Sequence, residues 1–180
     1  MTGLFVSLEG GEGSGKSTQV KRLAGYLSDC FPQREIVCTR EPGGTKQAEV
    51  IRKMLVTGAT DKFLPATEAL LMSAARAEHV AEVIQPALCR DAFVICDRYI
   101  DSTFVYQGFA HDIAVSTLEE VHQFACGGLM PDITLLLDVP TELGLLRARG
   151  RSSGGPNAES RFEGKGIAFH EKVREGFLEL

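Results

Sequence analysis

The sequence predicts an α/β fold in which a parallel sheet is covered by helices on both faces. Three observations support this prediction. Short segments rich in β-branched and aromatic residues recur along the chain, longer segments with helical spacing separate them, and the short segments are nearly continuously apolar. Continuously apolar strands are typical of parallel sheets that are buried on both faces. Ligands of such sheets bind at the carboxyl ends of the strands.

Four strands are expected, each bounded by loop-forming residues. They span Leu4–Glu9, Glu35–Thr39, Phe93–Asp97 and Ile133–Asp138. Asp97 and Asp138 each end an apolar run with a carboxylate. For Asp138 we expect the ordinary role of a strand-end or helix-capping group.

Helices are expected between these strands and after the last one. They span Lys16–Ser28, Lys46–Val56, Ala66–Leu88, Val115–Ala125, Thr141–Ala148 and Phe169–Leu180. The Ser, Gly and Pro content at about 150–160 favours a flexible lid. No strand follows the last helix, so the visible sheet is expected to have four strands.

Size and composition indicate one soluble globular domain over residues 1–180. A chain of this length can bury about 70% of its unfolded surface. Its 44% hydrophobic and 24% charged residues are ordinary proportions. No apolar run approaches the ~20 residues of a membrane span, and the N-terminus lacks the basic segment and cleavage site of a signal peptide.

Net charge and cysteine content limit which partners and which cellular compartment we expect for this protein. The net charge of −5 gives no support to nucleic-acid binding, which calls for a basic face. Five cysteines without a C-x-x-C pair argue against a disulfide framework or a zinc site. We therefore expect a cytoplasmic protein with no nucleic-acid or membrane partner.

A glycine-rich stretch, GGEGSGKST, follows the first strand at residues 10–18 and fits the motif G-x-x-x-x-G-K-[ST]. In this motif backbone N–H groups converge on phosphates, while the lysine and the hydroxyl reach the β/γ-phosphates and Mg²⁺. A dinucleotide-binding loop is excluded, because its third glycine would fall where Lys16 stands. The nucleotide contacts expected are Gly10, Gly11, Glu12, Gly13, Ser14, Gly15, Lys16, Ser17 and Thr18. This motif predicts a sheet of the P-loop NTPase type.

A phosphate loop alone fits kinases, GTPases and ATP-driven machines. GTPases read guanine with an N-K-x-D segment, but the only asparagine here is Asn157, which Ala158 follows. Arg147, Arg149 and Arg151 lie within five residues beside the expected lid. These features favour a small kinase with an arginine-rich lid.

Five separated segments resemble the thymidylate kinase family in order, and together they span most of the chain. They are EGGEGSGKSTQ (9–19), TREPGGT (39–45), LLMSAAR (70–76), CDRYIDSTFVYQG (96–108), and RARGR with SRFE within 147–163. The small Ser14 inside the loop is similar to the bacterial type, whose catalytic arginines lie in the lid. The resemblance implies a homodimer that transfers the γ-phosphoryl group of Mg²⁺–ATP to thymidine monophosphate (dTMP). It also implies a fifth strand and a further helix, which this chain would lack.

Phosphoryl transfer needs positioning and charge neutralisation more than covalent chemistry. We expect Lys16 on the β/γ-phosphates, and Ser17 and Asp97 as the Mg²⁺ ligands. Arginines that close over the transferred group can contribute ~10³ in rate. The arginines considered for this role are Arg147, Arg149, Arg151 and Arg161. The resemblance favours Arg151, and it implies Arg98 on the acceptor phosphate and Glu12 near the sugar 3′-hydroxyl.

The acceptor pocket is expected on the helix that carries LLMSAAR. Met72 and Arg76 are four residues apart and share one face, where a guanidinium can meet a thymine carbonyl. The family usually has phenylalanine in place of Met72, so this methionine either packs on the base or fills the core. The remaining expected contacts are Glu41, Pro42, Ser102, Thr103, Tyr106 and Gln107, with Tyr106 where the family discriminates against a 2′-hydroxyl.

Two other functions remain open from the sequence. One is a kinase for another nucleotide or for a deoxynucleoside, whose hydroxyl needs a general base such as Asp97. A monophosphate needs no base, because its second pKa of about 6 leaves it mostly a dianion at neutral pH. The other is a non-catalytic nucleotide-binding module. The lid arginines argue against this function.

Overall fold

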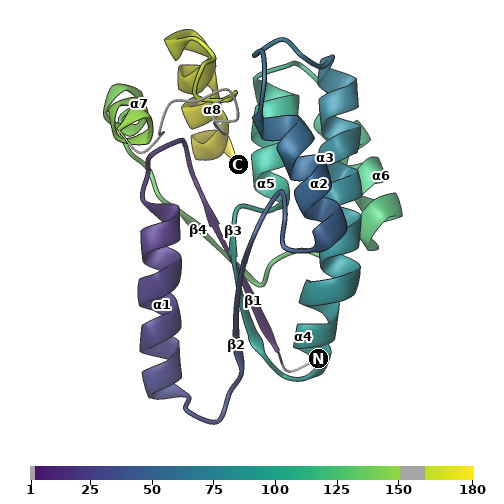
Figure 1. Cartoon of the computed structure of the whole chain (residues 1–180), viewed down its shortest axis with the longest axis vertical. Helices are drawn as coiled ribbons and strands as arrows, with labels where there is room; N and C mark the ends of the chain where they lie inside the picture. Colours follow the sequence, from purple (N-terminus) through teal and green to yellow (C-terminus); the bar gives the residue numbers. More distant parts are fainter. Residues whose placement is uncertain (1–2, 151–160) are drawn as a thin grey trace.

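The computed structural model describes residues 3–150 and 161–180 (Figure 1). Its strands are β1 (Leu4–Glu9), β2 (Ile36–Arg40), β3 (Phe93–Asp97) and β4 (Ile133–Leu136). They pair in parallel in the order β2-β3-β1-β4. The predicted four-stranded parallel sheet is therefore confirmed within the described residues, with strand bounds shifted by at most two residues.

The helices between the strands are α1 (Lys16–Cys30), α2 (Lys46–Val56), α3 (Pro65–His79), α4 (Gln85–Cys89), α5 (Ile100–Thr103), α6 (Val115–Cys126), α7 (Thr141–Arg149) and α8 (Ile167–Glu179). Two π-helical segments, η1 (Val80–Ile84) and η2 (Phe104–Phe109), join α3 to α4 and continue α5. No helix of the described residues is long and apolar enough to cross a bilayer.

Two helical regions differ from the prediction. The helix expected over Ala66–Leu88 begins at Pro65 and contains η1 just before Pro86. Proline has no N–H for the i→i−4 bond, so the hydrogen-bond ladder must change near it. No element was predicted for the run from Ile100 to Phe109, whose β-branched and aromatic residues favour strands. Burial of most of its side chains outweighs that preference.

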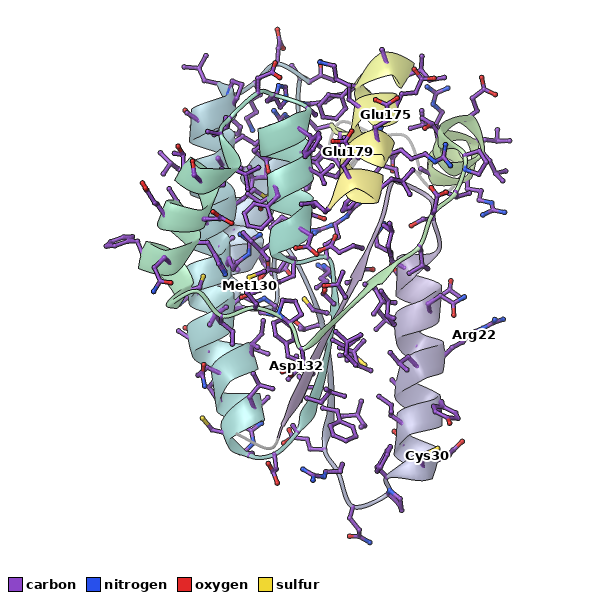
Figure 2. All side chains as sticks on the ribbon, turned by 180° about the vertical axis from the view of Figure 1, so that it is seen from behind. Arg22, Cys30, Met130, Asp132, Glu175 and Glu179 are labelled. Atoms are coloured by element: carbon purple, nitrogen blue, oxygen red, sulfur yellow. The ribbon has the colours of Figure 1, made fainter. Side chains whose placement is uncertain are left out.

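Helices cover both faces of the sheet, as predicted. On one face, Val6, Leu8 and Ile95 pack with Val20 of α1. On the other, Phe5 and the helical run from α3 to α4 form a larger cluster that α6 completes. Figure 1 shows α1 on the opposite side of the sheet from α3, α4 and α6. Figure 2 shows Arg22 on the outer side of α1, pointing away from the strands.

The carboxyl ends of β1, β2 and β3 meet at one edge of the sheet, where Leu8 pairs with Asp97 and Arg40 with the same residue. Next to this edge, η2 packs against α8 through Tyr106, Val173 and Phe177. In Figure 1, α7 and α8 lie at this end of the sheet, beyond the N-terminal end of α1. The predicted lid at about 150–160, which follows α7, lies outside the described residues except for Gly150.

Candidate active site

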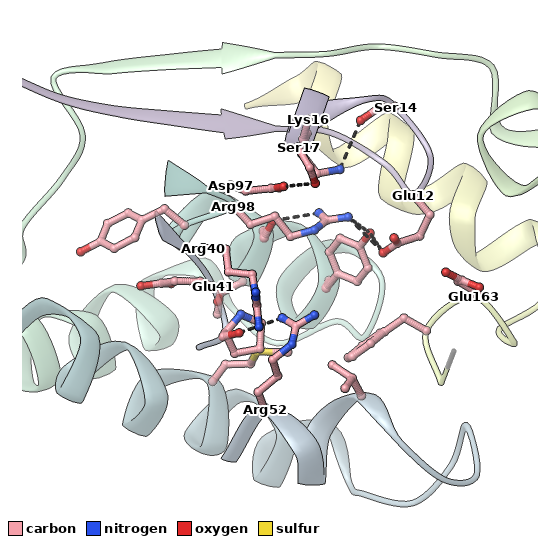
Figure 3. Close-up of a pocket in the computed structure, with 18 of the residues that line it drawn as sticks. Glu12, Ser14, Lys16, Ser17, Arg40, Glu41, Arg52, Asp97, Arg98 and Glu163 are labelled. Atoms are coloured by element: carbon pink, nitrogen blue, oxygen red, sulfur yellow. Dashed lines mark hydrogen bonds and ion pairs between the residues drawn. The ribbon is translucent and has the colours of Figure 1, made fainter. Parts of the chain in front are cut away.

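A pocket opens at the carboxyl ends of β1, β2 and β3, between the glycine-rich loop, α2, α3 and the α5–η2 run (Figure 3). Most of the predicted site residues line it. They are Glu12, Gly13, Ser14, Gly15, Lys16, Ser17, Glu41, Pro42, Met72, Arg76, Asp97, Arg98, Ser102, Thr103, Tyr106 and Gln107. The structure thus brings the predicted donor and acceptor residues into one cavity. Their binding of nucleotides stays a prediction.

Four predicted residues do not line this pocket, and the structure does not describe a fifth. Gly10 and Gly11 line a smaller cavity behind the loop. Thr18 is exposed, and its N–H already donates to the Gly15 carbonyl in the first turn of α1. Arg147 is exposed on α7. Arg151 lies outside the described residues.

The glycine-rich loop needs glycine for two reasons. Gly13 has a φ of 68° and Gly15 one of 95°, both in the left-handed region that glycine adopts readily. A Cβ at Gly13 would also overlap the carbonyl of Gly144 in α7. The loop backbone is therefore packed directly against α7, which fixes this helix beside the amides of the loop.

Lys16 lies folded over the loop. Its ammonium donates to the Gly10 and Gly11 carbonyls at 3.0 and 2.8 Å and to Ser14 Oγ at 3.2 Å. Burial and the nearby Arg98 charge lower the pKa of Lys16 to about 8, although Glu12 opposes this shift. The ammonium is thus a desolvated cation in the pocket, which strengthens its attraction for phosphate oxygens.

Asp97 and Ser17 form the candidate metal site. Ser17 Oγ donates to Asp97 Oδ2 at 2.6 Å, because the parallel pairing of β1 and β3 brings the end of β3 next to the loop. No cluster of three or more His, Cys, Asp or Glu side chains suits a metal ion within residues 3–150 and 161–180. Mg²⁺ is commonly held by one or two carboxylates plus substrate phosphates, so this pair fits that ion.

Arg98 stands at the centre of the pocket with a left-handed φ of 69°. Its guanidinium donates to Ser102 Oγ at 3.1 Å, Glu12 Oε1 at 3.0 Å and the Tyr106 hydroxyl at 3.2 Å. Burial opposes the charge, but Tyr106 and Glu12 outweigh it and keep the pKa of Arg98 above its usual value. The arginine is thus held in one orientation by three side chains.

Glu12 faces Arg98 from the loop, and the Tyr106 hydroxyl donates to it at 3.1 Å. Burial favours its protonated form, yet Arg98, Lys16 and the Tyr106 hydrogen bond lower the pKa of Glu12 overall. A carboxylate inside a phosphate loop is therefore balanced by the two cations beside it. Figure 3 shows Glu12 and Arg98 directed toward each other across the pocket.

Glu9, which sequence reasoning missed, lies beneath Arg98 at the end of β1. It is 1% exposed and accepts hydrogen bonds from the Tyr99 N–H at 2.7 Å and Ser102 Oγ at 2.6 Å. Burial is the main cause that raises the pKa of Glu9 to about 7. The carboxylate links β1 to the start of α5 and so supports the turn that carries Arg98. An acidic residue ending a buried strand was the available signal.

A second buried network lies around Arg76 on α3. Arg76 Nε donates to Glu41 Oε2 at 2.7 Å, and one terminal nitrogen donates to Thr103 Oγ1 at 2.8 Å. His79 contacts the other oxygen of Glu41 at 3.0 Å. The remaining terminal nitrogen of Arg76 is buried and has no hydrogen-bond partner among the described residues. A buried unpaired N–H is costly, so this atom is suited to a carbonyl oxygen of a ligand.

Three further pocket residues were also missed: Arg40, Arg52 and Glu163. Arg52 donates to the Pro42 carbonyl at 2.8 Å, and Arg40 pairs with Glu49 at 3.0 Å. A sequence signal existed for Arg52, because it shares helical spacing with the buried residues of α2.

Arg161 corrects one expectation. It was among the arginines considered for the transferred phosphoryl group, but its side chain is 1% exposed and pairs with Glu68 at 2.6 Å. Its guanidinium also donates to the carbonyls of Leu55 and Ala59, both at 3.0 Å. Arg161 is therefore a buried structural cation here. Arg147 and Arg149 remain exposed on α7.

Comparison with known proteins identifies close relatives of the whole chain. Residues 8–180 match a family model described as thymidylate kinase. The thymidylate kinase of Caulobacter vibrioides is 50% identical over 178 residues, covering 99% of this chain and 82% of that protein. The thymidylate kinase of Geobacter sulfurreducens is 48% identical, with 99% and 83% covered. A crystal structure of thymidylate kinase from Ehrlichia chaffeensis matches with a TM-score of 0.78 at 33% identity, covering 98% of this chain and 85% of that chain.

Proposed function

The chain belongs to the thymidylate kinase family, and on that premise we propose how its pocket carries out the reaction. The enzyme transfers the γ-phosphoryl group of ATP to dTMP and forms the diphosphate, a step toward dTTP. We divide the pocket into a donor side, formed by the loop at 10–18 with Asp97, and an acceptor side, formed by Arg98 and the residues around Arg76. Each side supplies a different part of the reaction.

On the donor side, the loop amides and Lys16 bind the ATP phosphates. Lys16 exchanges its bonds to the Gly10 and Gly11 carbonyls for phosphate oxygens, which is favourable for a desolvated cation. Ser17 and Asp97 would hold Mg²⁺, which neutralises charge on the β- and γ-phosphates when bound. Their 2.6 Å contact supports this assignment.

On the acceptor side, Arg98 binds the phosphate of dTMP. Three side chains fix its guanidinium, so little orientational freedom is lost when the phosphate arrives. Glu12 and Tyr106 lie next to it and would meet the sugar. Because the acceptor phosphate is already a dianion, it needs no general base.

The observation that carries the choice of acceptor is the unpaired terminal nitrogen of Arg76. It is buried in the same pocket as Met72 and Arg98, where a thymine carbonyl would satisfy it. Arg147 and Arg151 are proposed for the transferred phosphoryl group. Support for Arg147 comes from α7, which Gly144 packs against the loop.

A panel of acceptors tests this proposal. With ATP and Mg²⁺, we expect acceptor-dependent ADP formation with dTMP and not with thymidine. Arg76→Met should raise the KM for dTMP about tenfold or more, because the base loses a hydrogen bond and Glu41 loses its guanidinium partner, and it should leave the KM for ATP unchanged; thermal unfolding establishes first that the variant folds. Phosphorylation of thymidine alone would indicate a deoxynucleoside kinase, and ATP binding without acceptor-dependent turnover would indicate a non-catalytic module.

We also propose that the enzyme works as a homodimer in the cytoplasm. The family resemblance supports the dimer, and all five cysteines are unpaired in the structure, as expected in a reducing compartment. Light scattering coupled to size-exclusion chromatography would measure the oligomeric state directly, and a monomeric mass at micromolar concentration would contradict the first proposal.

A further inference from the structure

Glu68, near the start of α3, is a buried carboxylate that the proposed reaction does not use. It is 1% exposed and joins two segments that lie far from it in sequence. Gln107 Nε2 of η2 donates to Glu68 Oε1 at 2.7 Å, and a terminal nitrogen of Arg161 lies 2.6 Å from Glu68 Oε2. Each oxygen of the carboxylate thus has its own strong donor.

Arg161 is itself held firmly. Its other contacts are hydrogen bonds to the backbone carbonyls of Leu55, Ala59 and Thr60 at 3.0 to 3.1 Å, around the C-terminal end of α2. A guanidinium with its donors occupied in a fixed fork cannot swing away without breaking several bonds. Arg161 therefore fixes where the Glu68 carboxylate lies.

The Glu68 carboxylate in turn determines which way the Gln107 amide points. A carboxylate paired with a guanidinium offers only acceptors, so the NH₂ group of Gln107 must face it. The amide oxygen then lies on the opposite side of the carboxamide. Gln107 is 1% exposed and lines the pocket, and with its NH₂ group engaged by Glu68 we infer that the oxygen is the acceptor it offers to a base there.

Arg76 and Gln107 together define a pattern of hydrogen bonding in the pocket. The unpaired nitrogen of Arg76 is a donor, and the Gln107 oxygen is an acceptor. Thymine carries the complementary pair, a carbonyl at C4 beside the N–H at N3. A pyrimidine whose N3 is unprotonated would place one acceptor against another and leave both without a partner, which strongly disfavours binding.

We propose that Glu68 is a positioning residue for base selection: by fixing the Gln107 amide, it makes the pocket accept bases with an N–H at N3. The effect acts through Gln107 and is anchored by Arg161. This inference rests on the proposed placement of the dTMP base beside Arg76.

The selectivity of the enzyme between two acceptors tests the proposed role of Glu68. One is dTMP, and the other is the 2′-deoxyribonucleoside monophosphate of pyrimidin-2-one, which has an unprotonated N3 and no group at C4. Glu68→Gln lets the Gln107 amide turn over and donate to N3. We expect the ratio of the two kcat/KM values to fall about tenfold toward the analogue, while the KM for ATP stays unchanged. An unchanged ratio in the folded variant overturns the proposal.

Gln107→Met provides the second arm, because it removes the amide and leaves the Glu68–Arg161 pair intact. If Glu68 acts through Gln107, adding Glu68→Gln to Gln107→Met produces no further loss of selectivity. A further loss of the same size as in the single variant would assign Glu68 a different role and overturn the proposal. Failure of the wild-type enzyme to use dTMP would instead refute the proposed function.

Should Glu68→Gln not fold, Glu68→Asp keeps the charge for Arg161 and shortens the reach to Gln107. Circular dichroism and thermal unfolding establish folding first. The folded Asp variant must still shift selectivity toward the analogue, and wild-type selectivity in it counts against the proposal. Asp138→Asn, which alters an exposed Asp–Arg pair outside this pocket, serves as the matched control.

Discussion

On the donor side of the pocket, most of the charged and polar groups come from one contiguous loop, whereas on the acceptor side they come from segments far apart in the chain. Lys16 is held by carbonyls five and six residues before it. Arg76, in contrast, is held by Glu41, which precedes it by 35 residues, and by Thr103, which follows it by 27. The first side is built by local backbone geometry and the second by the tertiary fold.

This difference determines what each side depends on. The donor loop relies on backbone amides and left-handed glycines, which are insensitive to pH, and on a single cation, Lys16. The acceptor side relies on buried carboxylates, Glu9, Glu41 and Glu68, each paired with donors from another element. Removing one partner of such a pair leaves a buried charge, so this side responds strongly to charge changes.

Replacing Lys16 should reduce turnover more than any other change predicted here. A small loss of turnover would contradict the assignment of the loop as the donor side. Lys16→Met keeps the length of the side chain and removes the only loop cation, so we expect kcat to fall by about 10³. The fold should survive, because a buried ammonium with a pKa of about 8 is already disfavoured by burial. A coupled assay for ADP measures turnover, and thermal unfolding provides the control. Near wild-type turnover would show that the loop is not the donor site.

The same difference explains how much the sequence could predict. The loop, its helix and the strand ends could be predicted from the sequence, because a contiguous motif fixes both the residues and their geometry. In the structure, Ser17 contacts Asp97. The shared helix face of Met72 and Arg76 could also be predicted, since helical spacing alone puts them on one face. Both of them line the pocket.

The buried residues Glu68 and Arg161 have partners that no local pattern reveals. Glu68 meets Gln107 across 39 residues, and Arg161 meets Leu55 across 106. Arg161 was considered for catalysis because it follows the expected lid in sequence, but its burial against α2 is a tertiary property. No element was predicted for the run from Ile100 to Phe109, and its helical structure depends on packing that overrides its strand propensity.

The second prediction concerns Glu9, a buried carboxyl of the acceptor side, and the pH dependence of stability that it causes. A carboxyl whose pKa rises from 4.5 to about 7 on folding binds a proton more tightly in the folded state. Its contribution to stability is fully present below pH 4.5 and is lost as pH rises through 7, on the order of 3 kcal/mol in all. Glu9→Gln keeps hydrogen-bonding capacity toward Tyr99 and Ser102 without the titration.

The measurement is the free energy of unfolding by urea between pH 4.5 and 8, with wild type and Glu9→Gln compared at each pH. Burial lowers the pKa of His111, His122 and His170, so these groups make wild-type stability rise with pH, and their contribution must be subtracted. The difference between the two proteins isolates Glu9. We expect the Gln variant to gain stability relative to wild type as pH increases, and parallel curves would show that Glu9 does not titrate in this range.

The smallest effect is expected at Asp138, just beyond the end of β4, the strand next to β1. Its carboxylate pairs with Arg174 through two contacts of 2.7 Å, but both side chains are about 40% exposed. The Arg174 hydrogen bond lowers the pKa of Asp138, so any stabilisation is present at neutral pH and is lost only in acid. Solvent screens an exposed pair, so Asp138→Asn should cost less than about 1 kcal/mol at pH 7. The same urea titration measures it, and a cost as large as the pH-dependent change in stability expected from Glu9 would mean that burial is not what separates the two carboxylates.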